Sequence, residues 1–536
     1  MTRPAILTLL GLWLLGHFIP FIVTMDQTPS VPRSRAEMTN YRETSRYEDV
    51  LRFVDAVAEQ SKSVRVTSFG KTNEGRSLPV VVLSSPPTET PEAALRSRKL
   101  RVFIMANIHA GEVEGKEASL HLLRAIALGP LRPLLKDLTL LMAPIYNADS
   151  NERVSSDNRR NQKGPEGGVG NRENAQGLDL NRDFIKLETP EANALVQQVF
   201  NRWDPHVIID LHTTNGSYHG YALTFAPALN PNGDERVIRT TREDILPAVR
   251  KRMKDAHGYE TYFYGNFRDE NHPEKGWETF DHRPRFGNNY VGLRNRIAIL
   301  SEAYAYIDFR TRIDVTEKFV QSILEYSAQH ARELIRVVAE ADRRMRTPLD
   351  AGTSQLGIRF ALRPLPQPVD ILGNEVIAET DPATGKGVFR RTDKIIVYRT
   401  RDFGLFEATE TRKLPAFYLI EPSQSVIIEK LRAHGIAVER FPRPLRTEVE
   451  VFRVDSLKRS PRPFQQHNEA KLAGPWRREL REFPAGTFRV STRQPLGRLA
   501  FYLLEPESDD GLVTWNFFDD VLASLPADFP VYRTGN

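Results

Sequence analysis

The feature that most constrains the fold is an alternation of short apolar runs with helical patterns between residues 45 and 345. Runs of strand length occupy residues 64–69, 78–83, 101–108, 138–144, 206–211 and 296–301. Between such runs, apolar side chains recur at helical spacing, as at Leu120, Leu123 and Ile126, and a long helical pattern covers residues 315–345. This alternation predicts an α/β domain whose mixed, largely parallel sheet is flanked by helices.

The pattern changes after Arg346, where prolines punctuate a linker-like stretch. Strand-like runs then cover residues 394–398, 416–420, 448–454 and 499–504, and one short helical pattern covers residues 425–435. A chain of 536 residues exceeds what one hydrophobic core usually supports. We therefore expect an α/β domain over residues 40–346 and a smaller, β-rich accessory domain over residues 347–536.

The first 24 residues have the composition of an address segment. Arg3 precedes an apolar stretch over residues 5–23, after which the chain becomes polar. This order is typical of an export signal, and the stretch is also long enough for a membrane anchor. We expect residues 1–24 to be a signal peptide or an N-terminal anchor. The protein is then periplasmic or extracellular, and a retained segment would associate it with a membrane.

Composition excludes several classes of function. The chain has no cysteine, which rules out disulfides, cysteine-ligated metals and thiol catalysis. A bound metal must therefore be held by histidine, aspartate or glutamate. The net charge of +5 is small for this length, and no block of lysine and arginine indicates nucleic-acid binding. Oligomeric state is not predicted.

A metal site is predicted where the run at residues 101–108 ends. Three His-x-x-Glu patterns occur: His109–Glu112, His257–Glu260 and His330–Glu333. With 12 histidines, about one such match is expected by chance. Only the first follows a buried strand and precedes a helix, and ligands of open α/β sheets collect at such strand ends. His109 and Glu112 are therefore the predicted ligands.

The strand predicted at residues 206–211 supplies a third ligand. It ends in Asp210-Leu-His212, so the imidazole of His212 is expected at the same sheet edge. A lone histidine at a strand end is more often structural, but its pairing with His109 and Glu112 reverses that preference. Two histidines and one carboxylate leave a fourth position open, which is the arrangement of catalytic zinc. Other divalent ions also bind such ligands.

A general base is predicted at the end of the strand at residues 296–301. Glu302 follows a run of apolar and small residues, so its carboxylate is expected to be partly buried beside the metal. Burial raises the pKa of a carboxyl group, whereas a nearby dication lowers it. Together these effects would allow Glu302 to take a proton from water and pass it to a leaving amine.

Over residues 45–345 the sequence resembles the zinc metallocarboxypeptidases of the carboxypeptidase A-like kind. The motifs that carry the resemblance are Glu74-Gly-Arg76, His109-x-x-Glu112, Asp179-Leu-Asn181-Arg182, Asp210-Leu-His212 and Glu302, in this order. The resemblance implies a zinc-dependent peptidase with one Zn²⁺ ion. It also implies a peptide or protein substrate that loses its C-terminal residue.

The resemblance further implies roles that spacing alone could not assign. Asn181 and Arg182 resemble the pair that binds the terminal carboxylate of the substrate, and an arginine fork suits that group. Arg159 resembles the arginine that polarises the scissile carbonyl, with Arg160 as the competing candidate. The family also supplies a tyrosine before the catalytic glutamate. Tyr290 is the nearest candidate here, but its distance from Glu302 in sequence is short and it is not assigned.

Two rival functions fit parts of this pattern. Deacylases of the aspartoacylase and succinylglutamate desuccinylase type share His-x-x-Glu, Asp-Leu-Asn-Arg and a later histidine, and they hydrolyse N-acyl amino acids. The export signal, the longer domain and the Glu74-Gly-Arg76 segment disfavour them. A catalytically silent binding protein on the same scaffold is disfavoured because every expected catalytic position is intact.

Overall fold

The computed structural model describes residue 1, residues 30–347 and residues 354–535 apart from 381, 383 and 385. The predicted export segment at residues 5–23 lies outside the described residues. Among the described residues, no helix has both the length and the apolar character needed to cross a bilayer.

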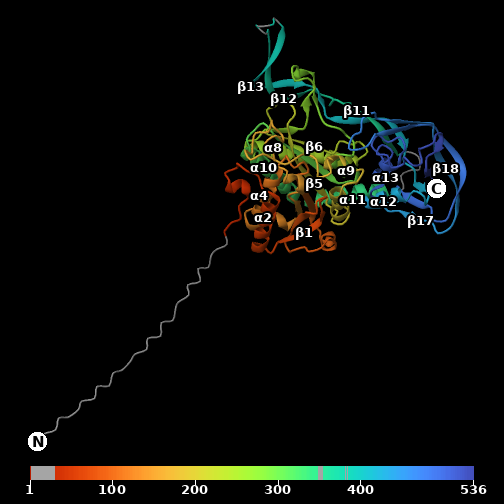
Figure 1. Cartoon of the computed structure of the whole chain (residues 1–536), viewed down its shortest axis with the longest axis horizontal. Helices are drawn as coiled ribbons and strands as arrows, with labels where there is room; N and C mark the ends of the chain where they lie inside the picture. The colour runs from red at the N-terminus through yellow and green to blue at the C-terminus, as the bar shows by residue number, and fades with distance from the viewer. Residues whose placement is uncertain (2–29, 348–353, 381, 383, 385, 536) are drawn as a thin grey trace.

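An eight-stranded sheet forms the centre of the first region (Figure 1). In spatial order its strands are β1 (Val64–Lys71), β2 (Ser77–Leu83), β4 (Leu138–Ala143), β3 (Leu100–Ala106), β5 (Val207–Thr214), β10 (Ile297–Tyr304), β6 (Leu223–Pro227) and β7 (Thr261–Phe263). The four central strands, β4, β3, β5 and β10, are parallel to one another. The pairs β1–β2, β2–β4 and β10–β6 are antiparallel, and β7 is parallel to β6. The predicted fold class, an α/β fold with a mixed and largely parallel sheet, is confirmed.

The central strands are continuous apolar runs because both faces of the sheet are covered. All residues of β3, β4 and β5 are buried. One face packs against a layer in which α4 lies between α2 and α10, and α8 packs beside α10. These helices are α2 (Tyr47–Gln60), α4 (Glu114–Leu128), α8 (Leu246–His257) and α10 (Phe309–Gln329).

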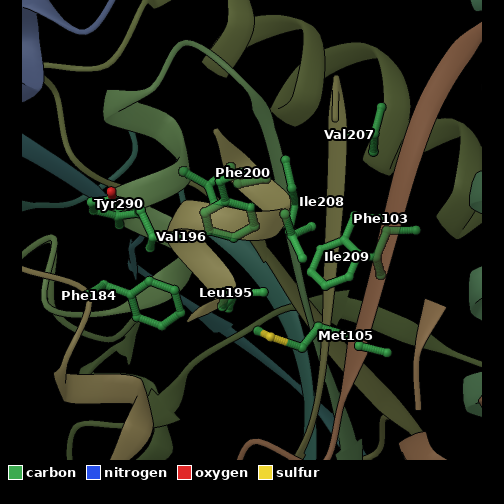
Figure 2. Close-up of a cluster of buried hydrophobic side chains, with 14 of the residues drawn as sticks. Phe103, Met105, Phe184, Leu195, Val196, Phe200, Val207, Ile208, Ile209 and Tyr290 are labelled. Carbon is green, nitrogen blue, oxygen red and sulfur yellow. The ribbon is translucent and has the colours of Figure 1, made fainter. Parts of the chain in front are cut away.

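The opposite face carries an aromatic cluster beneath the helical segment Leu195–Phe200 and the helix α9 (Gly287–Leu293) (Figure 2). The rings of Phe184, Phe200 and Tyr290 lie 5.6 to 6.5 Å apart, and Phe103 of β3 meets Phe200 edge-on. Aromatic pairs at such distances add to the stabilisation that burial itself gives.

The C-terminal region is rich in strands, as predicted. Its main sheet contains β17 (Glu439–Arg440), β22 (Phe488–Ser491), β16 (Phe417–Ile420), β24 (Val531–Thr534), β18 (Leu445–Val454) and β21 (Trp476–Phe483), with β23 (Ala527–Asp528) paired to β18. Smaller pairs are β11 (Gln355–Arg363) with β15 (Leu405–Lys413), β12 (Val369–Thr380) with β13 (Gly387–Thr400), and β19 (Ser456–Arg459) with β20 (Ala470–Ala473). The β12–β13 hairpin projects from the body of the molecule (Figure 1).

The two regions share contacts along much of their length. Strand β14 (Asp402–Phe403) of the C-terminal region pairs with β9 (Trp277–Glu278), which in turn pairs with β8 (Asn266–Phe267). One hydrophobic cluster contains buried side chains from both regions, from Val50 to Val531. The C-terminal region therefore packs as part of the same body.

Several predicted elements differ from the structure in type or in bounds. The apolar run at 499–504 is not a strand but belongs to the helix α13 (Gly497–Leu504), because a fully buried helix lacks the polar face by which helices are identified. The helical pattern at 315–345 divides at His330 into α10 and α11 (Ala331–Arg346). The predicted short helix is α12 (Ser425–Ala433). Strands β5 and β10 both continue about three residues beyond their predicted ends.

Candidate metal centre and substrate cavity

The first two predicted ligands lie on the turn that connects β3 with α4. Asn107 has a left-handed backbone, with φ of 66°, and turns the chain out of the sheet. The N–H of Glu112 donates to the carbonyl of His109 at 2.9 Å, which places both side chains on one side of the turn. His109 and Glu112 are 4% and 3% exposed, so their polar atoms need partners within the protein.

Strand register supplies the other two groups. β5 and β10 are parallel neighbours, and Glu302 lies directly opposite His212 in their register. Both side chains therefore leave the sheet side by side at the carboxyl ends of their strands. This is the sheet edge at which α/β proteins place ligands.

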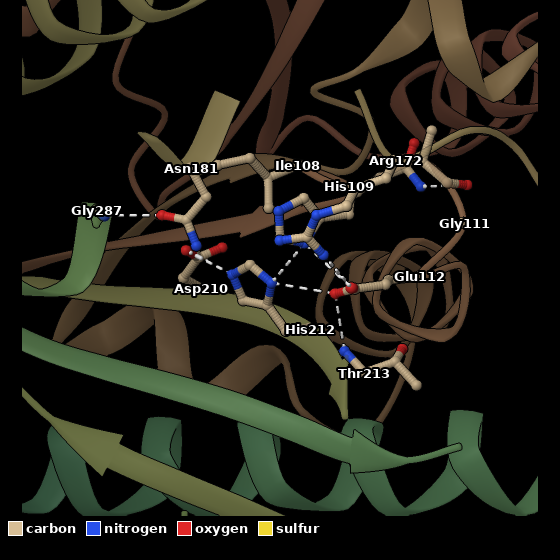
Figure 3. A network of polar contacts seen from close by, with 12 residues as sticks. Ile108, His109, Gly111, Glu112, Arg172, Asn181, Asp210, His212, Thr213 and Gly287 are labelled. Carbon is tan, nitrogen blue, oxygen red and sulfur yellow. Dashed lines mark hydrogen bonds and ion pairs between the residues drawn. The ribbon is translucent and has the colours of Figure 1, made fainter. Parts of the chain in front are cut away.

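The three predicted ligands converge on one point (Figure 3). His109 Nδ1 lies 3.1 Å from Glu112 Oε1, His212 Nδ1 lies 3.1 Å from Glu112 Oε2, and the two Nδ1 atoms lie 3.3 Å apart. In a tetrahedral zinc site with bonds of about 2.0–2.1 Å, neighbouring donor atoms lie about 3.3 Å apart. The donor set and its spacing therefore fit a zinc ion.

Each histidine is oriented from behind by a carboxylate. His109 Nε2 lies 3.0 Å from Asp179 Oδ1, and His212 Nε2 lies 2.9 Å from Asp210 Oδ2. A carboxylate in this position fixes the ring and leaves Nδ1 free to bind a metal. Asp179 and Asp210 were part of the sequence motifs, but their pairing with particular histidines could not be read from spacing.

Neighbouring positive groups keep the carboxylates of Glu112 and Asp179 ionised. Burial by itself raises the pKa of Glu112, but His109 and Arg159 lower it well below the usual value. Burial likewise raises the pKa of Asp179, and His109, Arg182 and Arg172 outweigh it and lower that pKa. An ionised carboxylate is the form that binds a metal or accepts from an imidazole N–H.

Glu302 has a different environment although it is only one strand away. Burial raises the pKa of its carboxyl group to about 8, and the negative charge of Glu112 adds to the rise. His212, Arg159 and Arg172 act in the opposite direction. Carboxyl groups with opposite shifts in one site are a common mark of divided roles.

Asn181 and Arg182 line the same cavity as the metal ligands. Asn181 Oδ1 accepts from the N–H of Gly287 at 2.8 Å, which ties its segment to the start of α9. The guanidinium of Arg182 lies 3.9 Å from the ring centre of Phe286 and 3.8 Å from Asp179. Its planar donor fork is thereby held at the cavity wall.

The structure distinguishes the candidate arginines of the long polar loop. Arg159 lines the cavity and donates to Glu112 Oε1 at 2.9 Å and to the carbonyl of Thr213 at 2.7 Å. The side chain of Arg160 is 75% exposed and pairs with Asp157 outside the cavity. A third arginine, Arg172, was missed by the sequence reasoning. It also lines the cavity, 2.9 Å from Asp179 and 3.5 Å from Glu112.

The cavity has a volume of about 290 Å³. Beside the charged groups, its wall contains the aromatic and apolar residues Tyr264, Phe280, Phe286 and Leu300. Tyr290 does not line it. That side chain is fully buried in α9, and its hydroxyl lies 2.8 Å from His434 Nδ1 of the C-terminal region. Tyr264 had no sequence signal, because it comes from the end of β7, a strand that the apolar pattern did not predict.

The remaining motif residues lie away from the cavity wall. Glu74 and Arg76 pair with one another at 2.6 Å near the turn between β1 and β2, and Arg76 also binds Asp149. His330 stacks on Tyr326 and lies 3.4 Å from Glu333. Among the described residues, only His109, Glu112 and His212 form a group of three side chains that could hold a metal ion.

The sequence of this chain matches a known protein family. Residues 50–282 match the family model described as zinc carboxypeptidase. The chain contains a zinc carboxypeptidase domain. The matched residues include His109, Glu112 and His212, the three candidate metal ligands. The sequence-based prediction of a zinc metallocarboxypeptidase-like hydrolase is confirmed by this match.

One known relative matches most of this chain, and another matches a shorter part of it. Carboxypeptidase 2 of Trichophyton equinum is 26% identical over 489 residues, which cover 86% of this chain and 81% of that protein. Carboxypeptidase Z of Homo sapiens is 30% identical over 173 residues, which cover 31% of this chain and 25% of that protein.

Solved structures of metallocarboxypeptidases also resemble this chain. A metallo-carboxypeptidase from Pseudomonas aeruginosa, in complex with (2-guanidinoethylmercapto)succinic acid, is 18% identical with a TM-score of 0.38. It covers 54% of this chain and 69% of its own. Carboxypeptidase A from Helicoverpa armigera is 15% identical with a TM-score of 0.39, and covers 54% of this chain and 75% of its own.

Proposed function

We propose that this protein is an exopeptidase that removes C-terminal residues from peptides, with one zinc ion held by His109, Glu112 and His212. The observation that carries the proposal is that the Nδ1 atoms of His109 and His212 lie 3.3 Å apart and each lies 3.1 Å from one carboxylate oxygen of Glu112, beside Glu302. When bound, zinc supplies Lewis-acid chemistry: it lowers the pKa of water and polarises a carbonyl group.

Glu302 is proposed as the general base and acid. Its position opposite His212 puts its carboxylate next to the candidate metal centre, where the side chain is half-buried in the cavity wall. Glu302 takes a proton from the attacking water and delivers it to the departing nitrogen. A bound dication would lower the pKa of Glu302 from the raised value that burial produces, which makes the carboxylate available as a base.

The terminal carboxylate of the substrate is proposed to bind Arg182 and Asn181. The guanidinium is stacked on Phe286, which keeps its planar fork in one orientation. A carboxylate binds such a fork through two parallel hydrogen bonds. If the substrate must place a free carboxylate at Arg182 and Asn181, cleavage is restricted to the C-terminal end of a peptide.

Arg159 and Arg172 are proposed to share the stabilisation of the developing oxyanion. Nε and both terminal nitrogens of Arg159 donate to Gln162, Glu112 and Thr213. Arg172 Nη1 makes only the 3.5 Å ion pair with Glu112. We therefore assign the donated hydrogen bond to Arg172, while Arg159 supplies positive charge and holds Glu112.

We also propose that the protein is exported. The proposal is supported by Arg3 and the apolar stretch at residues 5–23, which have the order of an export signal. The division into a carboxypeptidase domain at 40–346 and an accessory region at 347–536 is proposed on the change of secondary structure after Arg346.

A peptide digest tests the proposed function. The wild-type protein loaded with zinc should shorten peptides from the C-terminus, and the same peptides with an amidated C-terminus should resist. Glu302→Gln should retain zinc but lose turnover by about 10³-fold or more, because the base is gone and the ligands are intact. Cleavage of internal bonds in amidated peptides would contradict the proposal, as would an active Glu302→Gln enzyme. Mass spectrometry of the products and metal analysis give both readouts.

A further inference from the structure

The wall of the substrate cavity contains a loop that is held from two sides, by Asn230 and Asn289 of the carboxypeptidase domain and by side chains of the C-terminal region. This pocket loop, residues 279–286, runs from β9 to α9 and carries Phe280 and Phe286 into the cavity. The two rings lie 5.5 Å apart, and Phe286 supports Arg182. The position of this loop therefore sets both the shape of the side-chain pocket and the direction of the proposed carboxylate fork.

Arg285 attaches the pocket loop to the C-terminal region. Its backbone N–H donates to Asp510 Oδ2 at 2.7 Å, its Nε donates to Asp510 Oδ1 at 2.8 Å, and its Nη2 donates to Glu469 Oε1 at 2.6 Å. The side chain of Arg285 is 3% exposed and that of Asp510 is fully buried. Its guanidinium also lies 4.5 Å from the ring centre of Trp515. Buried charge pairs with several hydrogen bonds tolerate little displacement.

A second attachment lies three residues earlier in the same loop. His282 Nε2 is 2.9 Å from Asp509 Oδ2, and the hydroxyl of Tyr502 donates to the other oxygen of Asp509. Adjacent aspartates of the C-terminal region, Asp509 and Asp510, therefore hold two residues of the pocket loop, His282 and Arg285. Phe286 follows directly after Arg285, so its ring has little freedom to leave the cavity.

A third contact reaches the metal side of the cavity. The N–H of Asp179, whose carboxylate orients His109, donates to Gln465 Oε1 at 2.8 Å. Gln465 and Gln466 form a two-residue turn in which both have left-handed backbones, with φ of 50° and 66°. Such turns strongly favour Asn-Gly, because side chains with a Cβ are strained there. Strained turns of this kind persist where the surrounding contacts hold them.

We propose that the C-terminal region is a positioning device for the substrate cavity, acting through a clamp formed by Gln465, Glu469, Asp509 and Asp510. The clamp holds the pocket loop against the cavity and steadies the backbone of Asp179. None of the four touches the cavity wall, so they are positioning residues. The inference rests on the proposed function, because it assigns the pocket loop to the C-terminal side chain of a peptide substrate.

The full-length Asp510→Asn variant tests the clamp. It keeps the size of the side chain and removes the charge that Arg285 needs. Hydrogen–deuterium exchange should become faster in residues 281–287, and KM for peptides should rise about tenfold with kcat nearly unchanged. Preference among C-terminal side chains should also weaken, since Phe280 and Phe286 would no longer define one pocket. A purely structural role would lower the melting temperature without changing that preference.

Glu507→Gln is the matched control. Glu507 lies three residues before Asp510, and its substitution by glutamine removes the same charge. In the native protein the carboxylate of Glu507 binds Arg412 and Trp476 within the C-terminal region. The substitution should leave exchange of the pocket loop and KM as in the wild type. Unchanged exchange in Asp510→Asn, or faster exchange with unchanged KM and preference, would overturn the proposal. A wild-type protein that releases no C-terminal residue would instead refute the proposed function, while the exchange result still tests the clamp.

A second variant covers the case in which Asp510→Asn does not fold. Gln465→Asn combined with Gln466→Gly gives the two-residue turn its preferred sequence and removes the hydrogen bond to Asp179. The melting temperature should stay or rise, whereas kcat/KM should fall about threefold or more. If kcat/KM of this double variant is equal to or higher than that of the wild type, the turn has no positioning role.

Discussion

Arg159 and Arg172 lie on the same side of the cavity but hold different partners. Arg159 is fixed by Glu112, Thr213 and Gln162, so its position depends on the turn that carries the metal ligands. Arg172 is anchored through Asp179, and its Nη1 makes only the 3.5 Å ion pair with Glu112, which is why we propose that this nitrogen reaches a bound substrate. The two residues are of the same type, but their partners differ. We therefore propose that Arg159 supports a metal ligand and that Arg172 contacts the reacting carbonyl.

Substitution of each arginine by glutamine should give different defects. Arg172→Gln should lower kcat by about 10²-fold with little change in zinc affinity, because a donor to the oxyanion is lost. Arg159→Gln should weaken zinc binding, because Glu112 loses a charged partner while it remains buried. Steady-state kinetics and zinc titration of both variants measure these effects. The reverse pattern would show that Arg159 makes the catalytic contact.

Single residues at the site could be predicted where chemistry and local position agree. His109, Glu112, His212 and Glu302 follow apolar strands, and strand ends meet at one edge of a parallel sheet. Arg172 and Tyr264 could not be predicted. Arg172 is one of several arginines in a long polar loop, and only the folded path of that loop brings it to Asp179.

At the scale of secondary structure elements, the metal centre depends on the close approach of α4 to β5. Gly115, in the first turn of α4, faces Leu211 of β5, and a Cβ at this glycine would lie 2.7 Å from the Cβ of Leu211. Glu112 precedes this turn and His212 follows Leu211. The spacing between these two elements therefore sets the distance between two ligands.

Gly115→Ala should weaken zinc binding although alanine is the better helix former by about 1 kcal/mol. The added methyl group pushes the start of α4 away from β5, and the ligand atoms of Glu112 and His212 separate. Zinc affinity measured by competition with a chelator should fall, and the melting temperature of the metal-free protein should not rise by the amount that helix propensity predicts. Unchanged affinity would show that α4 and β5 can shift without moving the ligands.

Elements were predictable to the extent that their burial pattern is periodic. Helix α11 has one buried face, and the central strands are apolar throughout, so both types were identified from sequence. Helix α13 is buried on all sides, and its apolar run could not be distinguished from a strand. The break between α10 and α11 at His330 is set by packing, since the helical spacing of apolar residues continues across it.

At the scale of the whole molecule, buried neutral histidines connect distant segments. His206 Nδ1 accepts from the N–H of Arg101 at the start of the central sheet. His434, the residue that follows α12, lies 2.8 Å from the hydroxyl of Tyr290 and 3.2 Å from the carbonyl of Ile185, and so joins the two regions. Burial lowers the pKa of each histidine to about 3.

These histidines predict a loss of stability at mildly acidic pH. In the unfolded chain a histidine titrates near about 6.5, so between pH 6.5 and 3 the unfolded chain binds protons that the folded chain does not. The free energy of unfolding therefore falls as pH decreases through this window, by about 1 kcal/mol for each histidine at pH 5.5. His434→Gln should reduce the difference in unfolding free energy between pH 7.5 and 5.5. Urea unfolding at both values measures it, and an identical difference in variant and wild type would contradict the account.

The most direct test of the central claim is anomalous diffraction at the zinc edge from crystals of the zinc-loaded protein. We predict one strong peak, with His109 Nδ1, His212 Nδ1 and a carboxylate oxygen of Glu112 at about 2.0–2.2 Å and Glu302 close by without binding it. A peak elsewhere in the molecule, or one that His212 does not reach, would contradict the account.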